Sequence, residues 1–240
     1  YKNSYSLSRP PGHHCLPDYP NGFCLLANIA VAIEHSIKNK LGKKFCVIDW
    51  DVHHGNGTEA IFYNRNDVLT ISIHQERNYP VDTGMETHQG KQEGLGYNVN
   101  LPLPAGSGHQ AYLNLFDRVI NPIVSNYSPD IIIVACGFDA AMIDPLSSML
   151  CSAETFRLLT RKAQKLADEQ CNGKLALVHE GGYSEVYVPF CGHAVLEELS
   201  GSQIIAKDPY EELFNLRQPG SRFENMINEV LNDWEELFLK

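Results

Sequence analysis

The sequence predicts an α/β fold in which one parallel sheet carries helices on both faces. Apolar runs of strand length recur along the chain, and segments with helical spacing separate them. Strands that alternate with helices in this way pair in parallel and are covered from both sides. Polar residues follow the runs closely, and ligand sites in such folds lie beyond the carboxyl ends of the strands. The four runs are 45–48, 68–73, 131–135 and 175–178.

Length and composition predict one globular domain that spans residues 1–240. Hydrophobic residues make up 43% of the chain and charged residues 20%, which suits one sizeable core. The net charge of −10 argues against direct nucleic-acid binding and favours cationic substrates. No apolar run approaches a membrane span. The seven cysteines form no Cys-x-x-Cys pair, so we expect buried, reduced thiols and a cytoplasmic protein.

The opening of the chain has no periodicity, but it holds two adjacent histidines between prolines. Pro11 and Pro17 restrict the backbone around His13 and His14, which favours a defined, non-helical place for the pair. From residue 22 to residue 38 almost every position is apolar or small. This stretch predicts a helix that is buried on most sides.

The run 45–48 predicts a buried strand that ends in acidic and imidazole side chains. Alternate side chains of an extended chain point the same way, so Asp49, Asp51 and His53 share one face. Oxygen and nitrogen ligands without cysteine suit Zn²⁺ or Fe²⁺, and a third protein ligand would leave one position open. An Asp-x-His pattern alone is more often a turn without a metal, so the rest of the chain decides.

The next elements continue the alternation. A short helix is expected at 58–63, and the strand 68–73 ends at His74. The aperiodic segment 75–97 predicts a functional loop, because loops of this length are seldom idle in compact domains. A helical face follows at 112–123, where Pro122 marks a kink or break.

Two further strands lead into polar residues. The strand 131–135 is followed by Asp139, and the strand 175–178 by Tyr183. Ser152 caps the helix between them. The ends of parallel strands meet at one edge of a sheet, so one crevice is expected to collect the polar residues. Those residues are Asp51, His53, His74, Asp139 and Tyr183; the last helix carries its apolar face on Phe223, Met226, Ile227, Val230, Leu231 and Trp234.

Six segments, in the same order, resemble the histone deacetylase superfamily, and the class II bacterial histone deacetylase-like amidohydrolases most of all. The resemblance implies the arginase/deacetylase α/β fold. It also implies a Zn²⁺-dependent amidohydrolase that removes acyl groups. The segments are 9–14, 22–24, 49–57, 72–74, 137–145 and 180–183, and 189–192 and 197–199 resemble the bacterial branch.

Residue by residue, the resemblance implies two metal sites. Asp51, His53 and Asp139 would bind Zn²⁺, with Fe²⁺ as the other candidate. Asp49 and Ser72 would hold a structural K⁺ together with backbone carbonyls.

The resemblance also implies roles in proton transfer and substrate binding. His13 and His14 would handle protons, and Asn56, like Asp49, would orient them from behind. Tyr183 would donate a hydrogen bond to the substrate carbonyl. The residues that line the acyl tunnel would be Phe23, Tyr79, Gly22 and Gly182.

The chemistry of these groups is coherent. Three protein ligands leave Zn²⁺ a position at which water becomes acidic enough to attack at neutral pH. His14 can take the proton of that water and return it to the leaving amine. Tyr183 and the metal then stabilise the oxyanion. No acyl-enzyme is needed.

Members of this superfamily usually carry further strands, and an aspartate that grips the substrate, ahead of the segment that matches 9–14. We therefore expect that a missing N-terminal segment, or a second copy in a homo-oligomer, completes the domain. His74 and His179 are expected behind the ligands. The remaining histidines are expected at the surface or in packing, namely His35, His88, His109 and His193.

Four readings remain open. The leading substrate is an acyl-lysine protein or peptide, and the alternative is an acetylpolyamine. An arginase-like binuclear hydrolase would need the ligands of a second metal, and the Tyr183 loop argues against it. A catalytically dead binding module is the fourth reading, and the intact proton-handling and metal-ligating residues argue against it.

Overall fold

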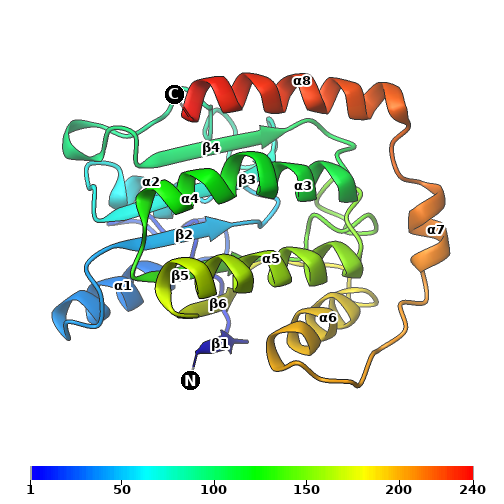
Figure 1. Cartoon of the computed structure of the whole chain (residues 1–240), viewed down its shortest axis with the longest axis horizontal. Helices are drawn as coiled ribbons and strands as arrows, with labels where there is room; N and C mark the ends of the chain where they lie inside the picture. Colours follow the sequence, from blue (N-terminus) through cyan, green and yellow to red (C-terminus); the bar gives the residue numbers. More distant parts are fainter. Residues whose placement is uncertain (1, 240) are drawn as a thin grey trace.

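The computed structural model describes residues 2–239, and it places six strands in one all-parallel sheet. The strand order is β1-β6-β5-β2-β3-β4, so β5 and β2 are neighbours at the centre. The predicted parallel α/β fold is confirmed (Figure 1). The strands are β1 (Asn3–Ser6), β2 (Phe45–Asp49), β3 (Val68–Gln75), β4 (Asn98–Leu103), β5 (Ile131–Cys136) and β6 (Leu175–His179).

Helices cover both faces of the sheet, as expected. Helices α1 and α2 pack on one face, and α3, α4, α5, α6 and α8 contribute to the core on the other. Helix α7 lies in the segment that leads from α6 to α8 along one side of the molecule (Figure 1). The helices are α1 (Asn28–Lys38), α2 (Asn56–Phe62), α3 (His109–Leu115), α4 (Asn121–Tyr127), α5 (Ala153–Cys171), α6 (Val188–Ser200), α7 (Glu211–Leu216) and α8 (Ser221–Phe238).

Strand β2 shows why two apolar cores form. All five of its residues are buried. Cys46 and Ile48 belong to the larger core, whereas Phe45 and Val47 belong to the smaller core under α1 and α2. Alternate side chains of a strand point to opposite faces, so a continuous apolar run supplies both layers.

The helix predicted over 22–38 is wrong in its first six residues, since α1 begins at Asn28. Phe23 has a φ of 66°, which a helix does not allow. Leu25 and Leu26 are 66% and 67% exposed, so this part of the apolar run is surface and not core. Side-chain composition alone could not separate the exposed turn from the buried helix.

Two edge strands were not predicted from the sequence. Strand β1 lies in the opening segment, which shows no periodicity, and it pairs with β6. Strand β4 is interrupted by asparagine and proline, residues that are depleted in strands, and it pairs with β3. Both lie at the ends of the sheet, where proline and short polar strands are tolerated.

The helical face at 112–123 is one helical path in three parts. A π-helical turn (η2, Phe116–Ile120) joins α3 to α4, and Pro122 lies in the first turn of α4. Proline lacks the N–H that an uninterrupted α-helix would use there, which accounts for the expected break. The segment 75–97 contains only one short 3₁₀ turn (η1, Gln92–Gly94), as its lack of periodicity predicts.

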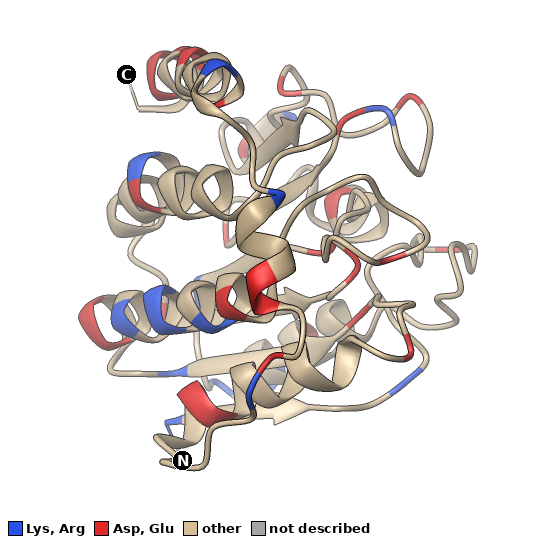
Figure 2. Ribbon diagram, turned by 90° about the vertical axis from the view of Figure 1, so that its right-hand side faces the viewer, with Lys and Arg blue, Asp and Glu red and all other residues tan. Residues whose placement is uncertain are grey.

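All seven cysteines are buried and free, as expected for reduced thiols. Within residues 2–239, no helix is both long and apolar enough to cross a membrane. Most of the charged residues sit on the outer helices and the loops (Figure 2). A buried carboxylate is therefore unusual among the described residues, and all of them except Glu197 on α6 lie at or beyond the carboxyl ends of β2, β5 and β6.

Candidate active site

The central strands bring three potential metal ligands together. Asp51 and His53 follow β2, and Asp139 follows the neighbouring β5. The His53 Nδ1 atom lies 3.1 Å from Asp51 Oδ1 and 3.0 Å from Asp139 Oδ2. One ligand atom from each residue falls within 4.8 Å of the other two. All three side chains are buried.

The electrostatics of this cluster suit a cation. Burial, and then the charge of Asp51, raise the pKa of Asp139 to about 7. Burial alone would lower the pKa of His53, but hydrogen bonds with Asp139 and Asp51 raise it to about 10. Two fully buried carboxylates so close together are costly unless a positive charge joins them. Two carboxylates and an imidazole are a donor set that fits Zn²⁺ or Fe²⁺.

Backbone amides hold the two carboxylates in place. The amide of Val52 donates to Asp139 Oδ1 at 2.8 Å, and the amide of Gly181 donates to Asp51 Oδ2 at 2.7 Å. Each carboxylate is thereby fixed by a segment that follows a different strand. These amide contacts fix the carboxylate oxygens relative to each other, which is what a selective metal site requires.

The adjacent histidines lie beside this cluster, with ring centroids 3.9 Å apart. His13 Nδ1 is 2.9 Å from Asp49 Oδ2, and His14 Nδ1 is 2.8 Å from Asn56 Oδ1. His13 Nε2 is 3.7 Å from Asp51 Oδ1. The structure therefore places Asp49 and Asn56, the two residues expected behind the histidines, in contact with them.

The two imidazoles have opposite protonation tendencies. Burial opposes a charge on His13, yet the carboxylates of Asp51 and Asp49 raise its pKa well above the usual value. Burial, and then the charge of His13, lower the pKa of His14 to about 3. His14 is the neutral member of the pair. Because the Asn56 oxygen accepts from its Nδ1–H, its Nε2 carries the free lone pair.

Tyr183 and two further aromatic rings surround the approach to the cluster. The Tyr183 ring lies edge-on to His53, with 6.4 Å between centroids, and its centroid is 6.2 Å from that of Phe23. Tyr79 is edge-on to His14 at 5.0 Å. Its hydroxyl donates to Asn21 Oδ1 at 2.8 Å. Phe23 is 73% exposed and Tyr79 39%, so both rings lie at the surface beside the cluster.

Two glycines in this region are required by geometry. Gly22 has a φ of 52°, and a Cβ on it would lie 2.3 Å from the His14 ring. Gly182 has a φ of 134°, which side-chain-bearing residues rarely adopt, and it shapes the turn before Tyr183. Gly22 therefore lies against His14, and Gly182 lies against Phe138 and Val188 directly before Tyr183.

Asp49 and Ser72, the expected potassium ligands, are paired across strands β2 and β3. Both are buried, and a small cavity of about 10 Å³ adjoins them. The Ser72 Oγ atom also accepts from the amide of Gly55 at 3.3 Å. This arrangement supplies oxygen donors in a confined space.

No hydrogen bond within residues 2–239 joins His74 or His179 to Asp51, His53 or Asp139, but His74 Nδ1 lies 3.0 Å from the Oγ atom of Ser72, an expected potassium ligand. Strand β3 continues to Gln75, so His74 is still paired within the sheet, and its Nε2 lies 2.9 Å from the Gly84 carbonyl oxygen. His179 Nδ1 is 3.2 Å from the Tyr5 hydroxyl. Strands β3 and β6 run further than expected, to Gln75 and His179, so both histidines belong to the sheet. His74 lies behind Ser72, and the place of His179 behind the ligands stays a prediction.

Two carboxylates were not identified from the sequence as functional. Asp144 accepts the amide of Tyr183 at 2.6 Å, and Glu180 accepts the amides of Gly12 and His13. Both lie in segments that resemble the superfamily. Glu180 stands between the end of β6 and the glycine turn before Tyr183, whereas only the resemblance of its segment marks Asp144.

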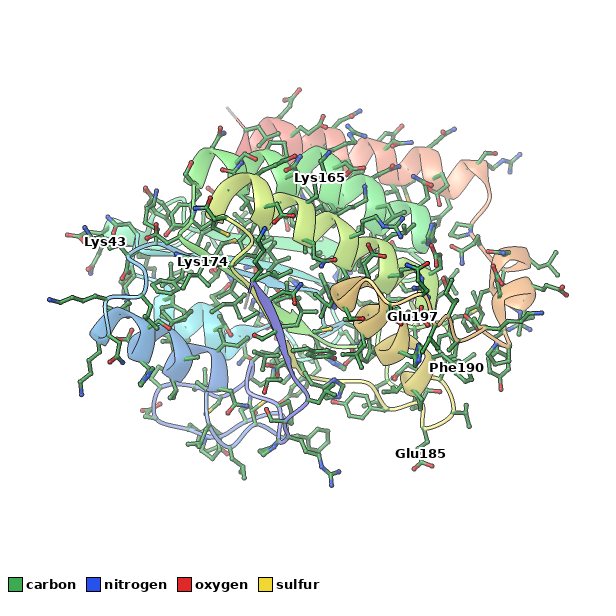
Figure 3. The ribbon with its side chains drawn as sticks, turned by 60° about the horizontal axis from the view of Figure 1, so that its bottom comes forward. Lys43, Lys165, Lys174, Glu185, Phe190 and Glu197 are labelled. Atoms are coloured by element: carbon green, nitrogen blue, oxygen red, sulfur yellow. The ribbon has the colours of Figure 1, made fainter. Side chains whose placement is uncertain are left out.

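A hollow of about 830 Å³ lies away from this site, bordered by α5, α6 and the segment 201–218. Some of its charged residues are paired with one another, as Arg161 is with Glu198. Figure 3 labels Phe190 and Glu197, which line it from α6. No potential metal-binding group within residues 2–239 lies there.

The sequence is similar to those of several named deacetylases and amidohydrolases. The histone deacetylase-like amidohydrolase of Pseudomonas aeruginosa is 47% identical over 231 residues, which cover 96% of this chain and 61% of that protein. A probable deacetylase of Archaeoglobus fulgidus is 36% identical over 231 residues, which cover 96% of this chain and 60% of that protein.

The fold is similar to that of a solved deacetylase domain. The crystal structure of the HDA15 HD domain matches with a TM-score of 0.82 and 35% identity, and the match covers 99% of this chain and 62% of that one. The chain thus spans about three fifths of the length of these proteins. The sequence profile of the histone deacetylase domain matches residues 1–199, and the protein belongs to that family.

Proposed function

We propose that the protein is a zinc-dependent amidohydrolase that removes acetyl or other acyl groups from acyl-lysine. The observation that carries this proposal is the buried Asp51, His53 and Asp139 cluster next to a neutral imidazole and a tyrosine. When bound, Zn²⁺ supplies positive charge that polarises the amide carbonyl and lowers the pKa of the attacking water. Membership of the histone deacetylase family supports the same chemistry.

His14 is the general base in this proposal. Its Nε2 is free because Asn56 accepts from Nδ1, and the neutral form prevails at physiological pH. It takes the proton from the attacking water and gives it to the leaving amine, so the hydrolysis needs no other proton source. His13, held as a cation between Asp49 and Asp51, provides positive charge close to the reacting atoms.

Tyr183 donates its phenol proton to the oxyanion that forms on the carbonyl. Burial raises the pKa of Tyr183 above its usual value, so the hydroxyl stays protonated and can donate. Its amide is fixed by Asp144, and Gly182 provides the turn that presents the ring.

The entrance supports a long, slender side chain as substrate. Phe23 and Tyr79 present apolar rings at the entrance. Behind them lies the charged floor of the site, which consists of Asp51, His53 and Asp139. A lysine side chain has the length and the apolar stem for such a passage. The acidic protein, with a net charge of −10, favours substrates that carry positive charge nearby.

A K⁺ ion between Asp49 and Ser72 completes the proposal. Strands β2 and β3 bring these oxygens together, and both residues are buried. A cation there would offset the charge of Asp49, which in turn faces His13.

The test combines metal analysis with a substrate panel on the full-length protein. We expect one zinc ion in the Asp51 site per chain, and hydrolysis of an acetyl-lysine peptide. Longer acyl-lysines and N-acetylputrescine, assayed in parallel, rank the acyl chains and separate a protein substrate from a polyamine. Two catalytic divalent ions per chain would favour an arginase-like enzyme. Bound zinc without hydrolysis of any substrate would leave a binding module.

A further inference from the structure

Glu180 is a buried carboxylate that joins two loops of the site. Its side chain is 4% exposed, and it immediately precedes the glycine turn that leads to Tyr183. A single oxygen, Oε2, accepts from the amide of Gly12 at 2.7 Å and from the amide of His13 at 3.0 Å. These bonds link residues that are more than 160 positions apart in the sequence.

The other side of the histidine loop is fixed as well. The His13 carbonyl oxygen accepts from the amides of Gly57 and Thr58 at 2.9 Å and 3.1 Å, at the start of α2. The backbone of His13 is therefore clamped between Glu180 at its amide and α2 at its carbonyl. Its ring has a third restraint at Asp49.

Glu180 is itself well anchored. Its amide donates to the Cys136 carbonyl oxygen at 3.1 Å, at the end of the central strand β5. The next residue, Gly181, donates to the ligand Asp51 and accepts from the amide of Phe138 at 2.8 Å. The Glu180 segment thus connects the proposed metal ligand Asp51 to the histidine loop through hydrogen bonds.

We propose that Glu180 is a positioning residue, whose carboxylate fixes the backbone of Gly12 and His13 and so holds both imidazoles in register with the metal ligands. The inference rests on the proposed function, in which His14 moves the proton. One buried acceptor oxygen holds both amides, and a displacement of about 1 Å at a reacting group can cost about 100-fold in rate. Glu180 touches no substrate in this role.

The contact pattern predicts which substitutions are tolerated. Glu180 Oε1 has no hydrogen-bond partner among the described residues, so one oxygen makes both contacts. Glu180→Gln keeps an acceptor oxygen at that place and should keep kcat within about threefold. Glu180→Met fills the same space without an acceptor, and kcat should fall by about 10- to 100-fold. Glu180→Asp withdraws the acceptor by one methylene and should resemble Glu180→Met.

A matched control comes from α6. Glu197 is also 4% exposed, and it accepts the amide of Ala206 at 2.6 Å, away from the site (Figure 3). Glu197→Met should lower the melting temperature without changing the kcat of the folded protein. The control separates the general cost of losing a buried carboxylate from an effect on the histidines.

The experiment measures kcat, KM and melting temperature of these variants, together with the ring resonances of His13 and His14 by NMR. Glu180→Met and Glu180→Asp should lower kcat more than they raise KM, and should shift both histidine resonances. A Glu180→Met variant that loses melting temperature but keeps kcat and the resonances would reduce Glu180 to a packing residue. Equal losses in Glu180→Gln and Glu180→Met would also overturn the proposal, because the acceptor would then not be what matters.

The resonances also separate this inference from the proposed function. If the wild type hydrolyses no acyl-lysine, the proposed function fails, and the spectra of the variants still report whether Glu180 fixes the histidines. If Glu180→Met does not fold, Glu180→Asp decides the same question.

Discussion

The proposed metal-binding cluster of Asp51, His53 and Asp139 and the proposed entrance at Phe23 and Tyr79 differ most in exposure. Asp51 and Asp139 are fully buried and receive backbone amides from neighbouring segments. Phe23 and Tyr79 stand in loops outside the sheet, and Phe23 is 73% exposed. In our proposal the strand ends position the residues that carry out the chemistry, and the loops determine which substrates reach those residues. Substitutions at the floor should therefore abolish function, whereas substitutions at the entrance should change preference among substrates.

The sharpest way to test the floor is Asp139→Ala. Asp51 and His53 come from one strand end and cannot complete a zinc site by themselves. Zinc affinity should therefore fall by more than about 100-fold, which exceeds the loss expected when only a residue behind a ligand is changed. Metal content after dialysis and activity in zinc-free buffer measure the loss. The control Asp117→Ala removes a surface pair with Lys162 and should keep the zinc. Undiminished stoichiometric zinc in Asp139→Ala would refute the ligand assignment.

Tyr183 stands between floor and entrance. Tyr183→Phe removes one oxyanion donor and keeps the ring, so kcat should fall by about 100-fold or more. Zinc content and melting temperature should stay as in the wild type, since neither depends on the hydroxyl. The control Tyr63→Phe alters a tyrosine outside the site and should leave kcat unchanged. Activity of Tyr183→Phe within a few-fold of wild type would remove the phenol from the mechanism.

The pH dependence tests the partner of His14. Asn56 accepts from His14 Nδ1 as a neutral amide, and the pKa of His14 lies at about 3. Asn56→Asp places a carboxylate there, which stabilises the imidazolium and raises that pKa, by about one pH unit or more. A general base must be unprotonated, so the acidic limb of the rate–pH profile should move to higher pH. An unmoved or lowered limb would contradict His14 as base or Asn56 as its partner.

The smallest effect is expected at the entrance. Tyr79→Phe removes the hydrogen bond to Asn21 but keeps the ring, a loss of about 1 kcal/mol that corresponds to a few-fold change in rate. The ratio of kcat/KM for longer acyl-lysines to that for acetyl-lysine should change, while zinc content does not. Asn21→Ala should have the same effect, and the double variant should add nothing more. Additive effects would show that the two residues act separately.

The position of Asp51, His53 and Asp139 was largely predictable from the sequence because parallel strands gather their carboxyl ends at one edge of the sheet. The period of two in a strand does not reach these residues, since β2 ends at Asp49 and Asp51 and His53 lie in the bend beyond it. The sequence does not reveal strand order, yet β2 and β5 prove to be neighbours, which brings Asp139 to the same place. Strand β3 runs two residues past its predicted end, so His74 lies within the sheet and contacts Ser72.

The entrance and the supporting contacts were less predictable. The turn at 22–27 reads as apolar helix in sequence, and only its positive φ values reveal it as a surface turn. Glu180 and Asp144 support backbone amides that lie far away along the chain, and no local pattern records such contacts. The resemblance to the superfamily supplied the roles of the tunnel residues, which periodicity cannot assign.

At Phe23 the stability of the fold and the proposed contact with substrate favour different residues. A phenylalanine at a φ of 66° sits in a region where a Cβ is crowded, at a cost of about 1–3 kcal/mol, and its exposed ring recovers little of this by burial. Phe23→Gly would relieve the crowding, although the freer unfolded chain would offset part of that gain. Such a variant would have a less strained turn but would lack the Phe23 ring at the proposed entrance. A screen for thermal tolerance alone would then drift toward proteins that last longer and grip their substrates less well.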